Sequence, residues 1–263
     1  MRDRVGMSYP WSTAWVTGAS TGIGRELVLQ LAAGGVRVAA TARSADKLAE
    51  LASISPNIVP APCDVTDRAA MGEAHAQIIA AFGKLDLAIL NAGVWDQTPA
   101  SRFDAGRAAE TLTVNFLGLA NAVEPLVAEM VARKGGHIAL VSSVAGYRGL
   151  PLAAYYGPSK AAAISLAEVL AGELPRHGVK VSVVNPGFVE TPMTAVNTFP
   201  MPFMIKADDA ARRIIRGLQK GRFEIVFPWQ MMAMMKFARL LPYPAFFWLV
   251  RNVIAGQANQ PQK

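Results

Sequence analysis

The chain of 263 residues has little cysteine, little histidine and few charged side chains. Its one cysteine, Cys63, excludes an intrachain disulfide and leads us to expect a reducing, cytoplasmic setting. The three histidines, His75, His137 and His177, show no metal-ligand spacing to one another, to the cysteine or to carboxylates. We therefore expect no catalytic metal.

The sequence also has no linker-like stretch and no long-period repeat. Only 17% of the residues are charged and 52% are hydrophobic, so the chain can bury a large core. Because α/β folds often run to about 250 residues as one unit, we expect a single domain. Residues 1–11 contain no apolar stretch that could serve as a secretory signal, and we expect them to form a short N-terminal extension.

The net charge of +7 is concentrated near the C-terminus. From Lys206 to Arg251, nine Lys and Arg residues stand against three Asp and Glu. No nucleic-acid-binding motif accompanies this excess, so we expect no nucleic-acid partner. A basic surface beside an apolar segment favours an anionic cofactor, a membrane surface or a protein partner.

Short β-rich runs alternate with longer helical patterns along the chain. Residues 13–17, 37–41, 57–61, 85–90, 137–141, 180–184 and 223–227 are predicted to form strands. Residues 23–33, 45–53, 68–82, 107–133, 155–174 and 208–220 are predicted to form helices. Strands separated by helices join through right-handed crossovers, so we expect a doubly wound, mostly parallel seven-stranded sheet with helices on both faces. This is an α/β fold of the Rossmann type.

Three glycines lie between the first predicted strand and the first predicted helix. Gly18, Gly22 and Gly24 have the spacing G-x-x-x-G-x-G. Without side chains, the backbone can turn tightly there and approach a pyrophosphate held at the helix N-terminus. The spacing favours a cofactor loop, and a glycine-rich turn without a further role is the alternative.

The second predicted strand is followed by a basic residue. Enzymes that use NAD generally carry an acidic residue about 20 positions after the glycines, where it binds the ribose 2′-hydroxyl. Here Arg43 follows the strand, and its guanidinium suits a 2′-phosphate. The sequence therefore favours NADP(H) over NAD(H), with an ordinary surface arginine as the alternative.

A tyrosine and a lysine stand four residues apart in a predicted helix. The spacing of Tyr156 and Lys160 brings a phenol and an ammonium onto one face. A nearby cation favours the phenolate, so we expect the pKa of the phenol to be lowered toward the working pH. The neighbouring Tyr155 has Ser159 at the corresponding position, which leaves Tyr156 as the acid/base candidate. Taken alone, such a pair could also be an exposed helix face.

Four further motifs occur along the chain. They are Asn91-Ala92-Gly93, Asn115, Ser142-Ser143 and Asn185-Pro186-Gly187. In order and spacing, all these motifs together resemble the classical short-chain dehydrogenase/reductase (SDR) family, over roughly residues 12–227. The resemblance implies an oxidoreductase that interconverts a carbonyl and its alcohol with NADP(H), as a homodimer or homotetramer. Leu90 replaces the first asparagine of the family's usual Asn-Asn-Ala-Gly.

The resemblance also implies four catalytic residues. Tyr156 would exchange a proton with the substrate oxygen, and Lys160 would lower the pKa of the phenol and hold the nicotinamide ribose. Ser143 would hydrogen-bond the substrate oxygen, because the family places its serine thirteen residues before the tyrosine. Ser142 would then be a structural hydroxyl. Asn115 would take part in a proton relay, with a satisfied core asparagine as the alternative.

The cofactor would lie along the carboxyl ends of the strands. By resemblance, its binding set comprises Gly18, Ser20, Thr21, Gly22, Ile23, Gly24, Arg43, Asp64, Val65, Asn91, Ala92, Gly93, Tyr156, Lys160, Pro186, Gly187, Val189 and Thr191. Asp64 and Val65 would lie at the adenine. Backbone groups of Val189 and Thr191 would orient the nicotinamide carboxamide.

The implied substrate pocket is largely apolar. It comprises Trp95, Val144, Leu150, Ala153, Phe188 and Met193, beside a substrate loop at about 192–207 that includes the segment 198–203. Such a lining favours a hydrophobic aldehyde, ketone or alcohol, while the nearby Arg148 leaves room for an anionic group.

The last part of the chain, residues 228–263, is an apolar and basic extension. Charges and prolines interrupt its apolar stretch 229–254, so it cannot be a spanning helix. Three roles remain open for it: a lid or part of the same core, a subunit interface, or a peripheral contact with a membrane.

A function of another class also fits the sequence. The chain could be a non-catalytic protein that binds NADP(H) as a sensor or scaffold. Such proteins commonly lose one of the reacting residues, whereas this chain has all four. The sequence therefore favours the enzyme.

Overall fold

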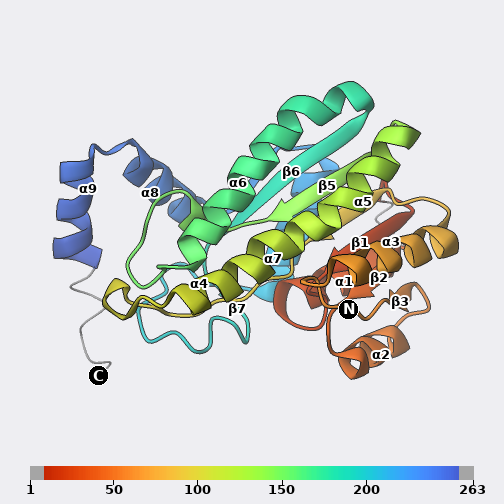
Figure 1. Cartoon of the computed structure of the whole chain (residues 1–263), viewed down its shortest axis with the longest axis horizontal. Helices are drawn as coiled ribbons and strands as arrows, with labels where there is room; N and C mark the ends of the chain where they lie inside the picture. Colours follow the sequence, from red (N-terminus) through yellow and green to blue (C-terminus); the bar gives the residue numbers. More distant parts are fainter. Residues whose placement is uncertain (1–8, 255–263) are drawn as a thin grey trace, which may run out of the picture.

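The computed structural model describes residues 9–254, and its centre is a seven-stranded parallel sheet with helices on both faces (Figure 1). The strand order is β3-β2-β1-β4-β5-β6-β9, and every pair is parallel. The strands are β1 (Thr13–Thr17), β2 (Arg37–Thr41), β3 (Ile58–Pro60), β4 (Leu87–Leu90), β5 (Gly136–Val141), β6 (Val179–Pro186) and β9 (Glu224–Phe227). The predicted fold class is confirmed.

Helices connect the strands and continue beyond the last one. They are α1 (Gly22–Ala33), α2 (Ala45–Ser53), α3 (Arg68–Phe82), α4 (Ala105–Leu112), a π-helical turn η2 (Thr113–Leu117), α5 (Gly118–Arg133), α6 (Tyr156–Glu173), α7 (Ala207–Gln219), α8 (Trp229–Leu240), α9 (Tyr243–Leu249) and η5 (Val250–Ile254). Two short strands, β7 (Val189–Glu190) and β8 (Ile205–Lys206), pair in parallel outside the main sheet. The sequence patterns did not predict β7 and β8, because two residues are too short for a visible alternation.

Both faces of the sheet are buried by helices. Alternate strand residues point to opposite sides and therefore belong to two different core clusters. On one face, Val16 and Ile89 pack with the buried residues of α1, α2 and α7. On the other, Trp15 and Leu90 pack with the buried residues of α3, α5, α6 and α8. Leu90, which stands where the family that the chain resembles has asparagine, is thus buried in an apolar core.

The helix predicted at 107–133 differs from the observed one in two ways. It begins at Ala105, because Asp104 caps it and accepts a hydrogen bond from the N–H of Arg107 at 3.0 Å. The π-helical turn Thr113–Leu117 then interrupts it. Such a turn inserts one extra residue per turn and often marks a functional site.

The stretch Ala105–Arg133 is also the one helical stretch, within the described residues, that is long and apolar enough to cross a membrane by length and composition. Leu119, Leu126 and Met130 on it are buried against the sheet. A buried core helix meets the same criteria of length and composition as a membrane-spanning helix.

The C-terminal helices pack by one side only. Met231 and Met235 of α8 are buried in the core, where α8 packs on β9, and Phe246 of α9 is buried as well. A polar network ties α8 to the sheet: Glu224 of β9 pairs with Lys236 and accepts a hydrogen bond from the hydroxyl of Tyr147. The opposite side of both helices carries large exposed apolar side chains.

Candidate active site

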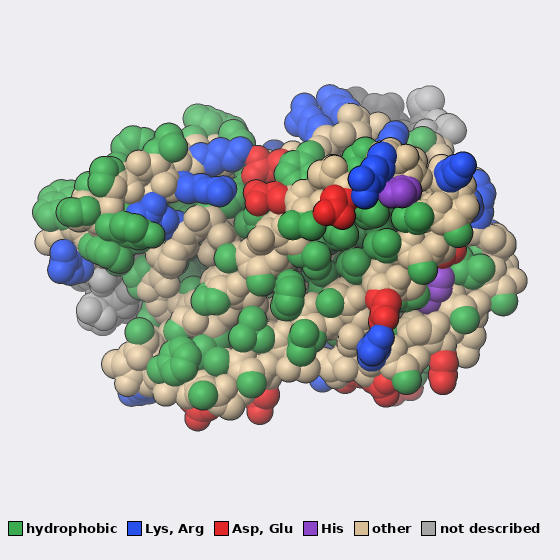
Figure 2. Space-filling model, turned by 45° about the horizontal axis from the view of Figure 1, so that its top comes forward, with side chains coloured by type: hydrophobic (Ala, Val, Ile, Leu, Met, Phe, Trp, Pro, Cys, Tyr) green, Lys and Arg blue, Asp and Glu red, His purple; other side chains and the backbone are tan. Residues whose placement is uncertain are grey.

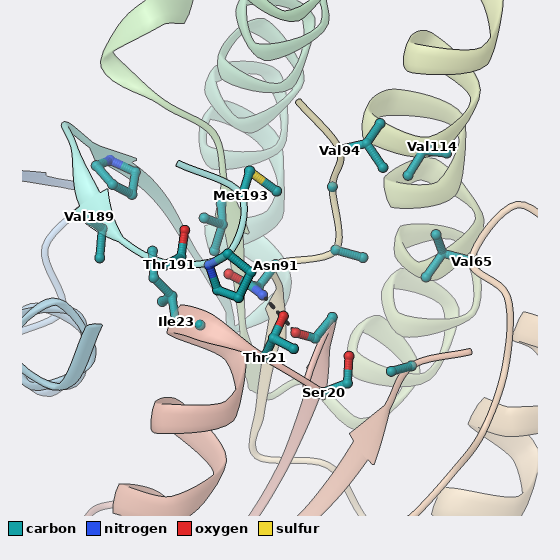
Figure 3. A pocket seen from close by; sticks show the side chains of 18 of the residues that line it. Ser20, Thr21, Ile23, Val65, Asn91, Val94, Val114, Val189, Thr191 and Met193 are labelled. Carbon is teal, nitrogen blue, oxygen red and sulfur yellow. Dashed lines mark hydrogen bonds between the residues drawn. The ribbon is translucent and has the colours of Figure 1, made fainter. Parts of the chain in front are cut away.

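A cavity of about 610 Å³ opens at the carboxyl ends of the strands, where the strand order reverses between β1 and β4. Figure 3 shows side chains around it from the start of α1, from the segment after β4 and from the loop after β6, with Thr21, Asn91 and Thr191 labelled. Of the predicted site residues, the cavity is lined by Gly18, Ser20, Thr21, Gly22, Ile23, Arg43, Asp64, Val65, Asn91, Ala92, Gly93, Ser143, Tyr156, Lys160, Pro186, Gly187, Val189, Thr191 and Met193. The structure therefore brings nearly all of the predicted cofactor set to one place.

The glycine turn forms the floor of the cavity. Gly18 and Gly22 have φ angles of 67° and 54°, which disfavour any residue with a side chain. Gly24 does not line the cavity, but a Cβ on it would overlap the carbonyl oxygen of Gly18. Asn91, after β4, donates from its amide to the carbonyls of Thr17 (3.2 Å) and Gly18 (3.3 Å). The conformation of the glycine turn is therefore fixed by its own glycines and by the side chain of Asn91.

The N-terminus of α1 points toward the same cavity. Thr21 is its N-cap in an extended conformation, and its side chain makes no capping hydrogen bond within the described structure. The first backbone N–H groups of a helix lack intrahelical partners and carry a partial positive charge. They form a suitable binding place for a pyrophosphate.

Two cations stand at the rim of the cavity. Arg43 is exposed at the end of β2, and Lys47 follows four residues later in the first turn of α2. Arg43 also contributes to lowering the pKa of Asp64, although the main cause is the N–H of Thr66, which donates to that carboxylate at 2.9 Å. The sequence reasoning missed Lys47, whose only signal was the four-residue spacing from Arg43.

Tyr156 and Lys160 lie together on the wall of the cavity. The ammonium nitrogen of Lys160 is 5.5 Å from the centre of the Tyr156 ring and donates to the carbonyl of Val141 at 3.1 Å. Burial raises the pKa of Tyr156 to about 12, while a hydrogen bond with Ser143 opposes the rise. Burial also lowers the pKa of Lys160 to about 8.

These directions correct one expectation. We expected the nearby cation to lower the pKa of the Tyr156 phenol, but in this structure it is raised. The physical reason is that removal from water disfavours the charged form of each group. A phenol with such a pKa holds its proton at neutral pH, as a proton donor must.

The two serines after β5 have different surroundings. Ser142 is buried and donates its hydroxyl hydrogen to the carbonyl of Lys160 at 2.7 Å, which ties α6 to the sheet. Ser143 accepts a hydrogen bond from the N–H of Ala145 at 3.1 Å and donates to the carbonyl of Pro186 at 3.4 Å. Of the two serines, Ser143 is the one that acts on the pKa of the Tyr156 phenol, which it lowers.

Asn115 is completely buried in the π-helical turn. Its side chain accepts from the N–H of Val94 at 2.7 Å and donates to the carbonyl of Val94 and to the hydroxyl of Ser159, both at 3.0 Å. A Cβ on Gly93 would lie 3.1 Å from the Asn115 amide oxygen and 3.3 Å from the Lys160 nitrogen. The amide is therefore satisfied, and its position beside Lys160 depends on a glycine at 93.

Three aromatic rings, which are not among the residues that line the cavity, pack beside Tyr156 or on one another. The ring of Trp95 meets that of Tyr156 edge to face at 5.0 Å, and Phe199 lies 6.4 Å from Trp95. Phe199 also lies 5.9 Å from Phe188. The indole N–H of Trp95 donates to Asn197 at 2.7 Å, which holds the loop after β7 against the wall.

Of the six predicted substrate residues, only Met193 lines the cavity, and Trp95 and Phe188 lie in the aromatic group described above. Val144 is buried in the core, and Ala153 forms an isolated bridge with Thr98. Leu150 packs against the same core cluster as Val144. Further lining residues that the sequence reasoning did not name as site residues are Ala42, Ser44, Lys47, Cys63, Val94, Val114, Val141, Ser142, Pro192 and Thr194.

The buried lysine predicts a pH dependence of stability. The pKa of Lys160 is about 8 in the folded chain, whereas in an unfolded chain it is near ~10.4. Between these values the unfolded chain binds more protons, so the free energy of unfolding should rise with pH, by about 1 to 2 kcal/mol between pH ~8 and ~9.5. Below that window both states are protonated, and the cost of burying the cation is constant.

Urea unfolding of the parent and of Lys160→Met across this window measures the effect. The variant should lack the rise, and the difference between the two proteins removes the contribution of other titrating groups. Lys180→Met is the matched control, because Lys180 is exposed, and it should keep the parent's slope. A parent-to-Lys160→Met difference that stays constant with pH would show that the ammonium is not desolvated.

Comparisons with known proteins agree on a family. The family model described as short chain dehydrogenase matches residues 12–199. An uncharacterized oxidoreductase of Myxococcus xanthus is 40% identical over 244 residues, which cover 91% of this chain and 96% of that protein. The 3-oxoacyl-[acyl-carrier-protein] reductase FabG of Thermotoga maritima is 33% identical over 183 residues, which cover 68% of this chain and 74% of that protein.

A solved structure has the same architecture. It is described as ribose-5-phosphate isomerase from Brucella melitensis and superposes with a TM-score of 0.75 at 27% identity, covering 84% of this chain and 91% of that one. This likeness concerns the fold, whereas the sequence relatives named above are oxidoreductases or reductases.

Proposed function

The chain belongs to the short-chain dehydrogenase family, and from this premise we propose that it is an NADP(H)-dependent enzyme that interconverts a hydrophobic ketone or aldehyde and its alcohol. Members of the family are oxidoreductases that use NAD(P)(H), and this chain is one of them. The proposal adds the choice of cofactor, the class of substrate and the roles of individual residues. The observation that carries it is the wall formed by Tyr156, Lys160 and Ser143 beside the glycine turn, in one cavity.

The residues of the cavity fit a dinucleotide. The glycine turn packs tightly on Asn91 and on itself, because a Cβ at Gly18 would lie 2.9 Å from the amide nitrogen of Asn91 and a Cβ at Gly24 would overlap the carbonyl oxygen of Gly18. This packing lets the backbone line the cavity, and the N-terminus of α1 offers N–H groups to a pyrophosphate. Lys160 would hold the hydroxyls of the nicotinamide ribose, and the segment Pro186 to Thr191 would hold the carboxamide. The bound cofactor supplies the hydride for reduction of the carbonyl carbon and takes it up in the reverse reaction.

The proton, unlike the hydride, is transferred by a side chain of the protein. During reduction, the hydroxyl of Tyr156 donates its proton to the carbonyl oxygen, whose new O–H bond completes the alcohol. Ser143 donates a hydrogen bond to the same oxygen and so withdraws negative charge from it as the reaction proceeds. The phenolate left on Tyr156 is stabilised by the ammonium of Lys160 beside it. In the direction of oxidation, the phenolate takes the proton back.

The aromatic wall supports an apolar substrate. Trp95, Phe188 and Phe199 lie next to the ring of Tyr156 or to one another, so the carbonyl would reach the phenol past apolar rings. We therefore propose hydrophobic aldehydes and ketones as substrates. Following NADPH consumption with a series of such carbonyls tests this, and turnover confined to polar sugars would contradict it.

Arg43 and Lys47 support NADP(H) over NAD(H). We expect NADPH to bind more tightly than NADH, and Arg43→Ala to weaken NADPH binding about tenfold while leaving NADH binding unchanged, because a charge-assisted bond to the 2′-phosphate is lost. Titration of each protein with either nucleotide, followed by nicotinamide fluorescence, measures this. Arg176→Ala is the control, since Arg176 is exposed and does not line the cavity. Equal binding of the two nucleotides by the parent would contradict the proposed role of Arg43.

The assembly and location follow the family. Its members are usually oligomeric, and we propose a homodimer or homotetramer that works in the cytoplasm, where Cys63 stays a free thiol.

A further inference from the structure

The outer side of α8 and α9 carries a cluster of exposed apolar side chains, which we call the C-terminal apolar face. Figure 2 shows hydrophobic side chains gathered at the left end of the molecule, over these helices, with basic side chains among them. Leu240 is 83% exposed, Trp229 67% and Trp248 61%. The complete set is Trp229, Met234, Phe237, Leu240, Tyr243, Phe247 and Trp248.

The exposure of this face does not come from a failure of the two helices to pack on the core. The inner side of the same helices buries Met231, Met235 and Phe246, so the helices already have a core-facing side. Monomeric soluble proteins rarely expose a contiguous apolar patch of this kind unless it binds something. The rings of Tyr243 and Phe247 stack at 5.8 Å, which gives the face a preformed aromatic surface.

The charged residues of the segment that forms this face are all basic. Residues 228–254 contain Lys236, Arg239 and Arg251 and no Asp or Glu. Lys236 pairs with Glu224 of β9, while Arg251 is exposed. Arg148 adds a further guanidinium, which lies over the rings of Tyr243 (4.8 Å) and Phe246 (4.3 Å).

This charge argues against a second copy of the chain as the partner. A two-fold interface brings the same patch of both subunits together. It would oppose Arg239 and Arg251 of one segment to those of the other, with no carboxylate within the segment to compensate them, and such like-charge contacts are costly. An anionic surface has the complementary sign.

The side-chain types point to the kind of anionic surface. Tryptophan and tyrosine favour the boundary between water and lipid, where a ring meets apolar chains and its polar group stays hydrated. Short amphipathic helices with aromatic and basic residues lie in that boundary and bind anionic lipids. We propose that the C-terminal apolar face docks this enzyme on the surface of an anionic lipid bilayer.

Direct contacts connect the helices of the C-terminal apolar face to residues near the cavity. Arg148, eight residues before Tyr156, donates to the carbonyls of Arg239 (3.0 Å) and Leu241 (3.2 Å) at the C-terminal end of α8. Met231 of α8 packs so closely on Gly187 that a Cβ there would lie 3.0 Å from it. Docking through α8 and α9 therefore places the active site beside the bilayer, where apolar carbonyls partition. The docking itself does not depend on the proposed reaction.

Flotation of the full chain with vesicles tests the proposal. The probes are vesicles of phosphatidylcholine alone and vesicles in which one third is phosphatidylglycerol. We expect the parent to float with the anionic vesicles, and the double variant Phe237→Gln, Trp248→Gln to lose about tenfold or more in partitioning. Arg251→Gln should lose about fivefold on anionic vesicles only, and added salt should weaken binding.

The matched control is Ile54→Gln, which removes an exposed aliphatic side chain (53% exposed, against 62% for Phe237) at the end of α2. It should float like the parent, and circular dichroism and melting should show every variant folded. A parent that stays unbound to anionic vesicles, or a double variant that floats like the parent, overturns the proposal. So does a lower molar mass of the double variant in solution without vesicles, because the face would then be a contact between copies.

Discussion

Replacing Tyr156 by phenylalanine is expected to lower the rate of carbonyl reduction by about 10²- to 10⁴-fold, because the substrate oxygen loses its proton donor. Affinity for NADPH should stay close to that of the parent, since the phenyl ring still fills the wall beside Trp95. Steady-state kinetics with an accepted apolar carbonyl, together with a fluorescence titration of the nucleotide, separate the two effects.

The adjacent tyrosine provides the control. The hydroxyl of Tyr155 accepts from the N–H of Asp104 at 2.5 Å and donates to the carbonyl of Arg102 at 3.4 Å, away from Lys160. Tyr155→Phe should cost about 1 kcal/mol of stability and leave kcat near the parent value. A Tyr156→Phe enzyme as fast as the parent would rule out the phenol as the proton donor. Tight NADPH binding by a parent that turns over no carbonyl would favour the sensor or scaffold instead.

Replacing Gly24 by alanine is expected to weaken NADPH binding about a hundredfold and to destabilise the fold by about 3 kcal/mol. The added Cβ would overlap the carbonyl oxygen of Gly18 and lie 2.7 Å from the amide nitrogen of Asn91. Backbone cannot yield as a flexible side chain can, so either the glycine turn or Asn91 must move. Both form the floor of the cavity.

Gly72→Ala is the matched control for that prediction. Gly72 lies inside α3, and a Cβ there would meet nothing within 4 Å among the described residues. Alanine should therefore stabilise the helix by about 0.5 to 1 kcal/mol and leave NADPH binding unchanged. Urea unfolding and nucleotide titration measure both variants. If Gly24→Ala bound NADPH as the parent does, the glycine turn would not be the pyrophosphate site.

Much of the fold could be predicted because its signals are local. The helices 45–53 and 68–82 have the predicted bounds. The second of them begins where Asp67 accepts a hydrogen bond from the N–H of Ala70 at 3.0 Å, a capping pattern that spans only four consecutive residues. The strands stood out because both faces of the sheet are buried, which gives short apolar runs between helical stretches.

The candidate site could be predicted in outline for a related reason. Parallel strands end at the same edge of the sheet, so residues that follow successive strands meet there without further information. That rule placed Gly18, Asn91 and Ser143 around one cavity. It could not find Lys47 at the rim, because this residue stands on a helix whose direction is set by packing. The sequence placed the segment 198–203 near Trp95, but only the structure shows that Phe199 is the residue whose ring meets it.

The sequence by itself determined the order of strands and helices, the glycine turn and the spacing of Tyr156 and Lys160, since each depends on residues a few positions apart. Only the tertiary structure decided how far those two side chains are removed from water, and so the direction in which their pKa values move. It also decided which side of α8 and α9 is buried and which is exposed. The burial of a side chain depends on every segment that packs around it, and a local sequence pattern does not contain this information.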